Sequence, residues 1–257
     1  MISIQNISKS FDARSVLVNL SLEIPKGKRC CIIGRSGCGK SVLLKIITGL
    51  MKPDSGKIII DDVEVDADNK KELFKLRRRI GYVFQGAALF DSYDVYTNVV
   101  LSLMEQGETD DEVLENEAKR VLSSVGLLPD IKKVDSPEFE KEWKILRKTM
   151  PSELSGGMRK RVGVARALVG SPDYIFYDEP TTGLDPITSE QIDKLILELD
   201  KTLEATSVII THDLYSVYSL AEQVVLIEDE TIRFEGTAEE LKNSDDEIVK
   251  QFLRRYE

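Results

Sequence analysis

The sequence lacks the features that would place the protein inside a membrane or around a histidine-built metal site. No apolar run approaches the ~20 residues that span a bilayer, and the opening residues MISIQNISKSF lack the long apolar stretch of a signal peptide. We therefore expect any membrane contact to come through another protein. The chain has one histidine, His212, which excludes a metal site built from several histidines.

Cysteine is also scarce, and basic residues are fewer than acidic ones. The three cysteines, Cys30, Cys31 and Cys38, form no CxxC pair, so they indicate neither a disulfide framework nor a zinc site and fit a reducing cytosol. Acidic residues outnumber basic ones by 45 to 35, which gives a formal net charge of −10. We therefore expect no nucleic-acid partner.

The chain does carry enough apolar material for one large α/β domain, since 42% of its 257 residues are hydrophobic. Alternation of apolar and polar residues predicts half-buried antiparallel strands at 2–5, 19–24 and 58–60. Continuous apolar runs favour strands buried on both faces of a parallel sheet at 30–33, 174–177 and 208–210. Helix-like segments follow the first and third runs, as in βαβ units.

The middle of the chain is more charged and has a helical period, which predicts an inserted helical subdomain within a single domain. We expect the following parts: 1–85 (β-subdomain and phosphate loop), 86–161 (helical subdomain, with an insertion at about 129–150), 162–230 (remaining core) and 231–257 (C-terminal helical tail).

The insertion contains a predicted helix over 135–148. Asp135 and Glu138 form a candidate capping box at its start, and Phe139, Trp143 and Leu146 fall on one face. We favour a surface segment that covers its own apolar face; contact with a specific partner is the alternative. In the tail, Thr237 and Glu240 predict a second capping box before an apolar stripe.

The segment GRSGCGKS follows the first continuous apolar run and precedes a helix-like segment, which is the context of a phosphate-binding loop. Its glycines allow backbone N–H groups to surround phosphate oxygens, and a helix N-terminus favours negative charge. We expect the lysine to reach the β- and γ-phosphates and the last serine to ligate Mg²⁺. The loop and its first following residue are Gly34, Arg35, Ser36, Gly37, Cys38, Gly39, Lys40, Ser41 and Val42. We expect Cys38 to be a small filler that alkylating reagents can still reach, because a helix N-terminus lowers thiol pKa.

Two further apolar runs end in polar residues at the same predicted sheet edge. Asp178 can hold Mg²⁺, usually through water, and Glu179 can take a proton from an attacking water. His212 follows the run at 208–210 and can contact a γ-phosphate. Each would be an ordinary residue alone, but ligands bind at the carboxyl ends of parallel strands beside such a loop.

A second glycine-opened helix start, Ser155-Gly156-Gly157, predicts a second anion site. The run Arg159-Lys160-Arg161 follows it, and a solvated helix face is its simplest interpretation. Upstream, the strand expected over 80–84 leads into Gln85 and then the apolar stretch Gly86–Phe90. An exposed apolar stretch beside polar residues is typical of a partner-binding surface.

Together these motifs resemble the nucleotide-binding subunits of ABC transporters. The matching pieces are GRSGCGKS, Gln85 after a strand, LSGGM at 154–158, YIFYDEP at 174–180, GLD at 183–185 and THD at 211–213. The resemblance implies a P-loop NTPase core of the RecA-like type with an antiparallel β-subdomain and an inserted helical subdomain. It also implies ATP and Mg²⁺ as ligands, and ATP hydrolysis coupled to transport.

The resemblance further implies roles for individual residues. Phe11 would lie against adenine, and Gln85 would sense Mg²⁺ and the attacking water. Ser155 and Gly157, at the start of the SGG helix, would bind the γ-phosphate held by a second copy, and Asp185 would link the two sites. Two subunits would thus enclose two ATP molecules.

A narrower resemblance, carried by FQGAALFDS, LSGGMRKR and YDEPTTGLDPITS, is to the Mla/Mce-type lipid transport ATPases. It implies an integral membrane permease, an MCE-domain protein and, in some members, a STAS-domain subunit as partners. It implies a location at the cytoplasmic face of the inner membrane, reached through the permease. The alternative is an ABC ATPase subunit for a different cargo, such as an amino acid, another small molecule or a drug.

Overall fold

The alternating N-terminal segments form an antiparallel sheet in the computed structural model, which describes residues 1–12 and 14–256. The strand order is β2-β1-β4-β5. Leu20, Leu22 and Ile24 point into the core while the residues between them are exposed, so the predicted alternation is confirmed. The strands are β1 (Ile2–Phe11), β2 (Arg14–Ile24), β4 (Ser55–Ile60) and β5 (Val63–Glu64).

The continuously apolar segments lie at the centre of a six-stranded sheet with the order β10-β9-β3-β8-β7-β6. Only β10 runs antiparallel to its neighbour. In β3, Cys31 and Ile33 face one apolar core, whereas Cys30 and Ile32 face a second core shared with the N-terminal sheet. The strands are β3 (Arg29–Gly34), β6 (Ile80–Val83), β7 (Tyr174–Asp178), β8 (Thr206–Ile210), β9 (Gln223–Glu228) and β10 (Thr231–Gly236).

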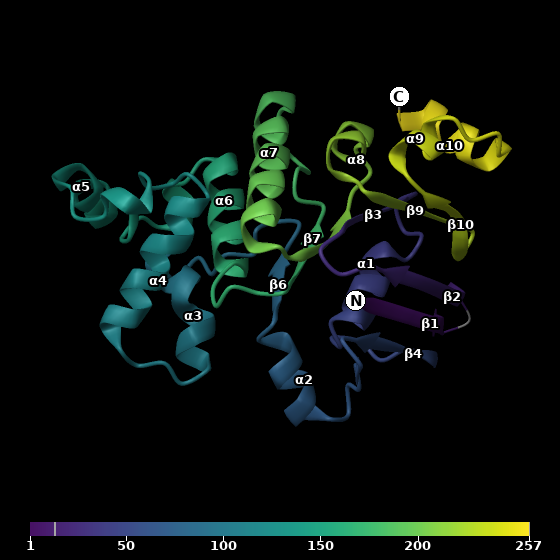
Figure 1. The fold of residues 1–257 in the computed structure, drawn as a ribbon, viewed down its shortest axis with the longest axis horizontal. Helices are drawn as coiled ribbons and strands as arrows, with labels where there is room; N and C mark the ends of the chain where they lie inside the picture. The colour runs from purple at the N-terminus through teal and green to yellow at the C-terminus, as the bar shows by residue number, and fades with distance from the viewer. Residues whose placement is uncertain (13, 257) are drawn as a thin grey trace.

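The helices are α1 (Lys40–Ile47), α2 (Lys70–Arg77), α3 (Val95–Glu105), α4 (Asp111–Ser124), α5 (Pro137–Leu146), α6 (Gly156–Ala167), α7 (Pro186–Leu203), α8 (Leu214–Leu220), α9 (Ala238–Lys242) and α10 (Glu247–Tyr256). Figure 1 shows α3, α4, α5 and α6 gathered at one end of the molecule, away from the N-terminal sheet and the C-terminal helices. The boundary expected at 161 falls inside α6, so we call residues 86–167 the helical region.

The parallel strands bring the sequence motifs to one sheet edge. The phosphate loop follows β3, Glu179 follows β7, His212 lies just beyond β8, and Gln85 lies just beyond β6. The strand expected over 80–84 ends one residue earlier: Phe84 leaves the sheet and is 40% exposed, because the chain turns here with Ala87 N donating to Phe84 O at 2.9 Å.

Helix α5 begins differently from the expected capping box. The N-cap is Ser136, whose hydroxyl accepts from the backbone N–H of Phe139 at 3.2 Å, and Pro137 is the first helical residue. Asp135 lies one residue too early to cap, because proline favours the first position of a helix and fixes the register.

The apolar face of α5 belongs to the core of the helical region. Phe139, Trp143 and Leu146 are buried there, as their spacing predicts. Trp143 Nε1 donates to Glu115 of α4 at 3.0 Å, and the Trp143 ring packs edge-on against Tyr96 of α3 with centroids 5.9 Å apart. The expected surface segment is thus a helix that covers the outer side of α3 and α4.

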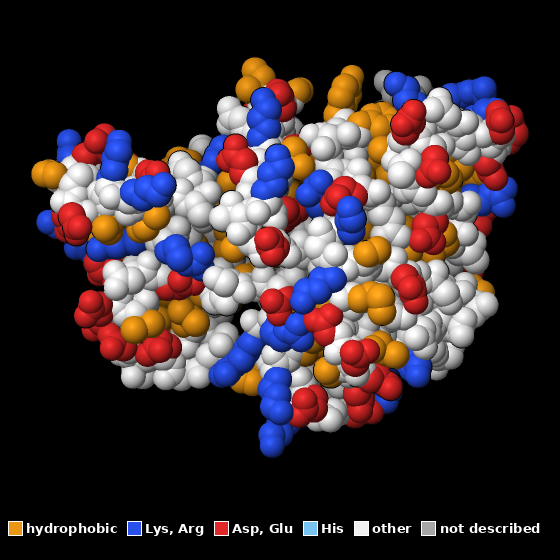
Figure 2. Space-filling view, viewed as in Figure 1, with side chains coloured by type: hydrophobic (Ala, Val, Ile, Leu, Met, Phe, Trp, Pro, Cys, Tyr) orange, Lys and Arg blue, Asp and Glu red, His pale blue; other side chains and the backbone are white. Residues whose placement is uncertain are grey.

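The helical tail expected over 231–257 begins instead with a strand, β10, because residues 231–236 pair with β9, and only α9 and α10 are helical; this tail packs on its own chain. Thr237 and Glu240 form the predicted capping box at the start of α9. Val249, Phe252 and Leu253 of α10 are buried in the same core as the parallel sheet. Among the described residues, no helix combines the length and apolar character needed to cross a membrane. Figure 2 shows acidic and basic side chains mixed over the visible face.

Helix α7 carries a buried aspartic acid, Asp200, and its burial disfavours the ionised carboxylate. Asp200 accepts a hydrogen bond from the Ser207 hydroxyl at 2.7 Å through one oxygen, and its other oxygen is buried without a hydrogen-bond partner. Burial raises the pKa of Asp200 to about 6. The folded protein therefore binds more protons than the unfolded chain between pH ~4 and ~6, and ionisation of Asp200 costs stability as pH rises through this window.

We expect Asp200→Asn to stabilise the protein above pH 6, because it removes the buried charge and keeps an oxygen for Ser207. The free energy of unfolding at pH 8 should rise by about 1–3 kcal/mol, and the gain should vanish near pH 4. Urea unfolding at both pH values measures this difference. A gain of equal size at both pH values would contradict the burial of charge as its cause.

Candidate functional site

A cleft of about 1020 Å³ opens between the N-terminal sheet and the carboxyl ends of the parallel strands. The residues that line it are Phe11, Asp12, Arg14, Val16, Ser36, Gly37, Gly39, Lys40, Ser41, Val42, Gln85, Glu179 and His212. Most of these come from the motifs singled out in the sequence. Asp178 lies just behind this wall and contacts Ser41.

The phosphate loop wraps around the amine of Lys40, which is only 7% exposed. Lys40 Nζ donates to the carbonyl oxygens of Gly34 at 2.8 Å and Arg35 at 3.0 Å. Gly39 caps α1 with φ of 101°, and a Cβ there would lie 2.8 Å from Leu17 and 2.9 Å from Val16. Only glycine therefore allows the N-terminus of α1 to approach β2 this closely.

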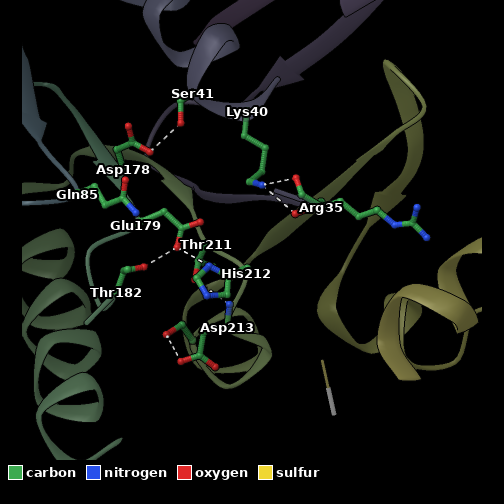
Figure 3. A network of polar contacts seen from close by, with 12 residues as sticks. Arg35, Lys40, Ser41, Gln85, Asp178, Glu179, Thr182, Thr211, His212 and Asp213 are labelled. Atoms are coloured by element: carbon green, nitrogen blue, oxygen red, sulfur yellow. Dashed lines mark hydrogen bonds and ion pairs between the residues drawn. The ribbon is translucent and has the colours of Figure 1, made fainter. Parts of the chain in front are cut away.

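Ser41 and Asp178 form a hydroxyl–carboxylate pair beside the lysine. The Ser41 hydroxyl donates to Asp178 Oδ1 at 3.2 Å, and Tyr82 OH donates to Asp178 Oδ2, also at 3.2 Å. Burial, followed by the charge of Asp178, raises the pKa of Tyr82 well above its ordinary value, so Tyr82 remains a donor. Figure 3 shows the Ser41 hydroxyl and the Asp178 carboxylate facing each other, Ser41 from the first turn of α1 and Asp178 from the end of β7.

Glu179 is held by two side chains. Its Oε2 accepts from the Thr182 hydroxyl at 2.8 Å and from His212 Nδ1 at 2.7 Å. The backbone of Glu179 is left-handed, with φ of 52°, which few residues other than glycine adopt without cost. In Figure 3 the Glu179 carboxylate points toward Thr182 and His212, whereas the Asp178 carboxylate points toward Ser41. The structure thus separates the two neighbouring carboxylates into different surroundings.

Gln85 lines the cleft, but the stretch Gly86–Phe90 is less exposed than expected. Ala87 is buried, and Leu89 is half-buried against the core of the helical region, because the backbone folds back onto α6. Phe90 is 50% exposed, and its ring lies 5.8 Å from that of Tyr93. The large apolar side chains exposed here are therefore Phe84, Phe90 and Tyr93, which we call the apolar patch.

The sequence interpretation missed three lining residues: Asp12, Arg14 and Val16. They surround Phe11 at the open end of the cleft, where β1 ends and β2 begins. A basic residue shortly after the aromatic residue could have suggested that Arg14 faces the same ligand. The sequence does not show how the N-terminal sheet lies relative to the phosphate loop, so it cannot show that the start of β2 faces the cleft.

The SGG segment and Asp185 do not line this cleft, among the residues that the structure describes. Instead, Ser155 caps α6, and its hydroxyl accepts from Met158 N at 3.2 Å. Asp185 caps α7, where it accepts from the backbone and hydroxyl of Thr188 at 3.0 and 2.6 Å. These bonds lower the pKa of Asp185. Gly156 and Gly157 open α6.

Two residues of the phosphate loop, Arg35 and Cys38, are not among the residues that line the cleft. Arg35 pairs with the nearly buried Glu228 through its Nε at 2.9 Å. Burial raises the pKa of the Cys38 thiol, and this outweighs the opposing effect of Lys40. The expected lowering of this pKa at the helix N-terminus is therefore wrong, and Cys38 is a poorly ionised, partly buried filler.

Known proteins are similar to this chain in sequence and in fold. The sequence profile of the family described as ABC transporter matches residues 17–182. The intermembrane phospholipid transport system ATP-binding protein MlaF of Haemophilus influenzae is 35% identical over 254 residues, which cover 99% of this chain and 90% of that protein. MlaF of Escherichia coli strain K12 is 36% identical over 98% of this chain and 88% of that protein.

A solved structure described as the dimeric post-hydrolysis state of the ATP-binding cassette MJ0796 bound to ADP and Pi superposes with a TM-score of 0.79. It is 31% identical and covers 93% of this chain and 99% of its own. The predicted fold class is confirmed by this similarity. By family profile, near full-length relatives and fold, the chain belongs to the ABC transporter family and is an ATP-binding cassette.

Proposed function

We propose that the protein is the ATP-hydrolysing subunit of a transporter that moves phospholipids between membranes. The observation that carries this proposal is near full-length similarity to two MlaF proteins, combined with an intact cleft of Lys40, Ser41, Glu179 and His212. A substrate other than phospholipid is the alternative, and the partners decide between them.

We expect ATP to bind in the cleft with its base at the open end. Phe11 and Arg14 lie at the open end, where the base would stack on the aromatic ring. The triphosphate would lie along residues 34–42, with Lys40 at the β- and γ-phosphates. Lys40 would exchange its carbonyl partners in the loop for phosphate oxygens.

The pair of Ser41 and Asp178 fits Mg²⁺, which prefers oxygen ligands. Their oxygens are 3.2 Å apart, so both side chains could hold the ion, with oxygens of the nucleotide and of water as further ligands. Among the described residues no cluster of three or more His, Cys, Asp or Glu could hold a metal, which agrees with a site completed by the nucleotide. The metal would neutralise charge on the phosphates.

Glu179 is the proposed general base for the attacking water, and His212 and Thr182 hold its carboxylate. Gln85 faces the same space and would orient the water and the metal. His212 would also contact the γ-phosphate. These residues do positional and proton-transfer work, as hydrolysis of a phosphoric anhydride requires.

A second copy of the chain would complete the site. Ser155, Gly156 and Gly157 would bind the γ-phosphate held by the other copy, and Asp185 would link the two sites. The side chains of Tyr215 and Ile187, 84% and 70% exposed, are the most exposed of the described large hydrophobic residues. They belong to the first turns of α8 and α7, at the sheet edge that carries the site. This supports the site-bearing face as the face that a second copy covers.

The apolar patch fits a membrane-embedded permease subunit. Phe84 directly precedes Gln85, and Phe90 and Tyr93 follow it in the same loop, so a partner bound to these exposed side chains would touch the loop that holds a proposed catalytic residue. We propose peripheral association with the cytoplasmic face of the inner membrane through this permease. An MCE-domain protein and a STAS-domain subunit would complete the complex.

We expect Phe90→Ser to weaken binding to the permease and leave ATP binding unchanged, because Phe90 is exposed and outside the cleft. The tagged chain would be purified from membranes, and its partners identified by mass spectrometry. An MCE-domain protein among them supports lipid transport, whereas an amino-acid-binding protein points to the alternative cargo. Loss of an exposed aromatic anchor should reduce permease recovery about tenfold or more.

Ile145→Ser is a matched control, because Ile145 is exposed to a similar degree on α5. If the Phe90→Ser variant recovers as much permease as the unmodified chain does, the apolar patch is not the permease contact.

A further inference from the structure

Side chains of α6 donate hydrogen bonds to backbone carbonyl oxygens of the loop that begins at Gln85. Three residues on one side of α6 take part: Lys160, Gly163 and Arg166. Lys160 Nζ donates to Gln85 O, and the two guanidinium nitrogens of Arg166 donate to Ala87 O at 2.7 Å and Ala88 O at 2.8 Å. The loop is thereby bound to α6 through three of the four residues 85–88.

Gly163 allows this grip. A Cβ at Gly163 would lie 3.1 Å from the Cβ of Ala87, tighter than ordinary contact. Ala87 and Ala88 have left-handed backbones, with φ of 61° and 47°. Such conformations persist in non-glycine residues when the surrounding structure holds them. The hydrogen bonds from α6 supply that support, so the shape of the loop depends on α6.

Lys160 reaches a second loop that Arg166 does not. The same Nζ donates to Glu179 O at 3.3 Å. The side chain of Lys160 is only 6% exposed, and burial lowers its pKa despite the nearby charges of Glu179 and Asp178. A buried ammonium is retained at a cost unless its hydrogen bonds are made, so both carbonyl oxygens are needed where they are. One side chain of α6 thus connects the loops that hold Gln85 and Glu179.

Helix α6 also connects these two loops to the SGG segment at its N-terminus. The N-terminus of α6 is the SGG segment, which in the proposed function faces the nucleotide of the second copy, and Lys160 lies four residues after Gly156. A small rotation of α6 would move Lys160 Nζ and both carbonyl groups with it. Glu179 is further fixed by its left-handed backbone, so a shift of its carbonyl also turns its carboxylate.

We propose that Lys160 is a positioning residue that couples α6 to the Gln85 and Glu179 loops at once, so that engagement of the SGG segment by a second copy sets the attacking-water geometry in the first copy's own site. This inference rests on the proposed function and adds to it the internal link between the two halves of the composite site. Among the described residues Lys160 is not one of those that line the cleft, and it would act through the two loops whose carbonyl oxygens it binds.

The test uses Lys160→Met in the full-length chain, with steady-state ATP hydrolysis, ATP binding and thermal unfolding measured together. We expect kcat to fall on the order of 10²-fold, since misplacement of about 1 Å has effects of that size, while KM for ATP stays within about threefold. Lys160→Arg retains donors for both carbonyl groups and should recover part of the lost kcat. Lys144→Met is the matched control: Lys144 is an exposed helical lysine on α5, and its loss should leave kcat unchanged.

A double-mutant comparison separates coupling of two loops from support of one. In a Gln85→Ala background, Arg166→Met should add less than about a twofold loss of kcat, because Arg166 acts through the Gln85 loop alone. Lys160→Met should still lower kcat about fivefold or more in that background, because the Glu179 loop is also released.

Three results would overturn the inference. One is kcat of Lys160→Met within about twofold of the unmodified chain. Another is loss of ATP binding and of thermal stability in parallel with kcat, which indicates a merely structural lysine. The third is no added effect of Lys160→Met over Gln85→Ala. Normal hydrolysis by Glu179→Gln would instead contradict the proposed role of Glu179 itself, so the two failures are distinguishable.

Discussion

Glu179→Gln is expected to bind ATP with nearly unchanged affinity and to hydrolyse it on the order of 10²–10⁴-fold more slowly, the range for loss of a general base. The amide can still accept from Thr182 and His212, whose hydrogen bonds hold the present carboxylate. The loop geometry should therefore survive, and only the proton acceptor is lost. ATP that is bound but not cleaved should accumulate in a dimer.

Single-turnover hydrolysis and size-exclusion chromatography with ATP and Mg²⁺ measure the two halves of this prediction. Glu140→Gln on α5 is the control, because Glu140 is a partly exposed carboxylate in a surface ion pair with Lys144. Hydrolysis by Glu179→Gln at the unmodified rate would require another base. A variant that hydrolyses ATP slowly but stays monomeric with ATP would support Glu179 as the general base and contradict a site shared between two copies.

Lys40→Ala should abolish most nucleotide binding. Removing one partner of a buried, hydrogen-bonded charge pair costs about 2–5 kcal/mol, which corresponds to a rise in the ATP dissociation constant of roughly 30-fold to several thousand-fold. The amine also holds Gly34 O and Arg35 O in the structure, so its loss releases the loop as well as the phosphates. Isothermal titration with ATP and Mg²⁺ measures the change.

Lys45→Ala is the matched control for this variant. Lys45 lies on the same helix, α1, but it is exposed and outside the cleft, so its loss should leave affinity unchanged. Equal affinities for ATP in Lys40→Ala and the unmodified chain would show that residues 34–42 are a structural turn.

The parts of the site that the sequence predicts are those written in consecutive residues. The phosphate loop, the Asp178-Glu179 pair and His212 each follow an apolar strand, and parallel strands bring their carboxyl ends together. Contacts between distant segments leave no such pattern. Lys160 and Gln85 are 75 positions apart, and a run of three basic residues in a helix fits a solvated face equally well.

Local competition explains the remaining differences. Asp135 and Ser136 are both good N-caps, and only the position of Pro137 selects the second. Leu89 and Phe90 are adjacent and equally apolar, yet one packs on the helical region and the other faces solvent. Which of the two packs inward depends on the left-handed backbone at Ala87 and Ala88. Alanine rarely adopts this conformation, so the sequence shows no sign of it.

Trp143, packed between α5, α4 and α3, is also the chain's only tryptophan. Its indole donates to Glu115 and lies 5.0 Å from the guanidinium of Arg147, so its emission should be sensitive to small shifts among these helices. The eight tyrosines are spread over the whole chain. Selective excitation of the indole therefore gives an optical signal that originates in the helical region alone, and the native protein carries its own label for movements of that region when ATP is added.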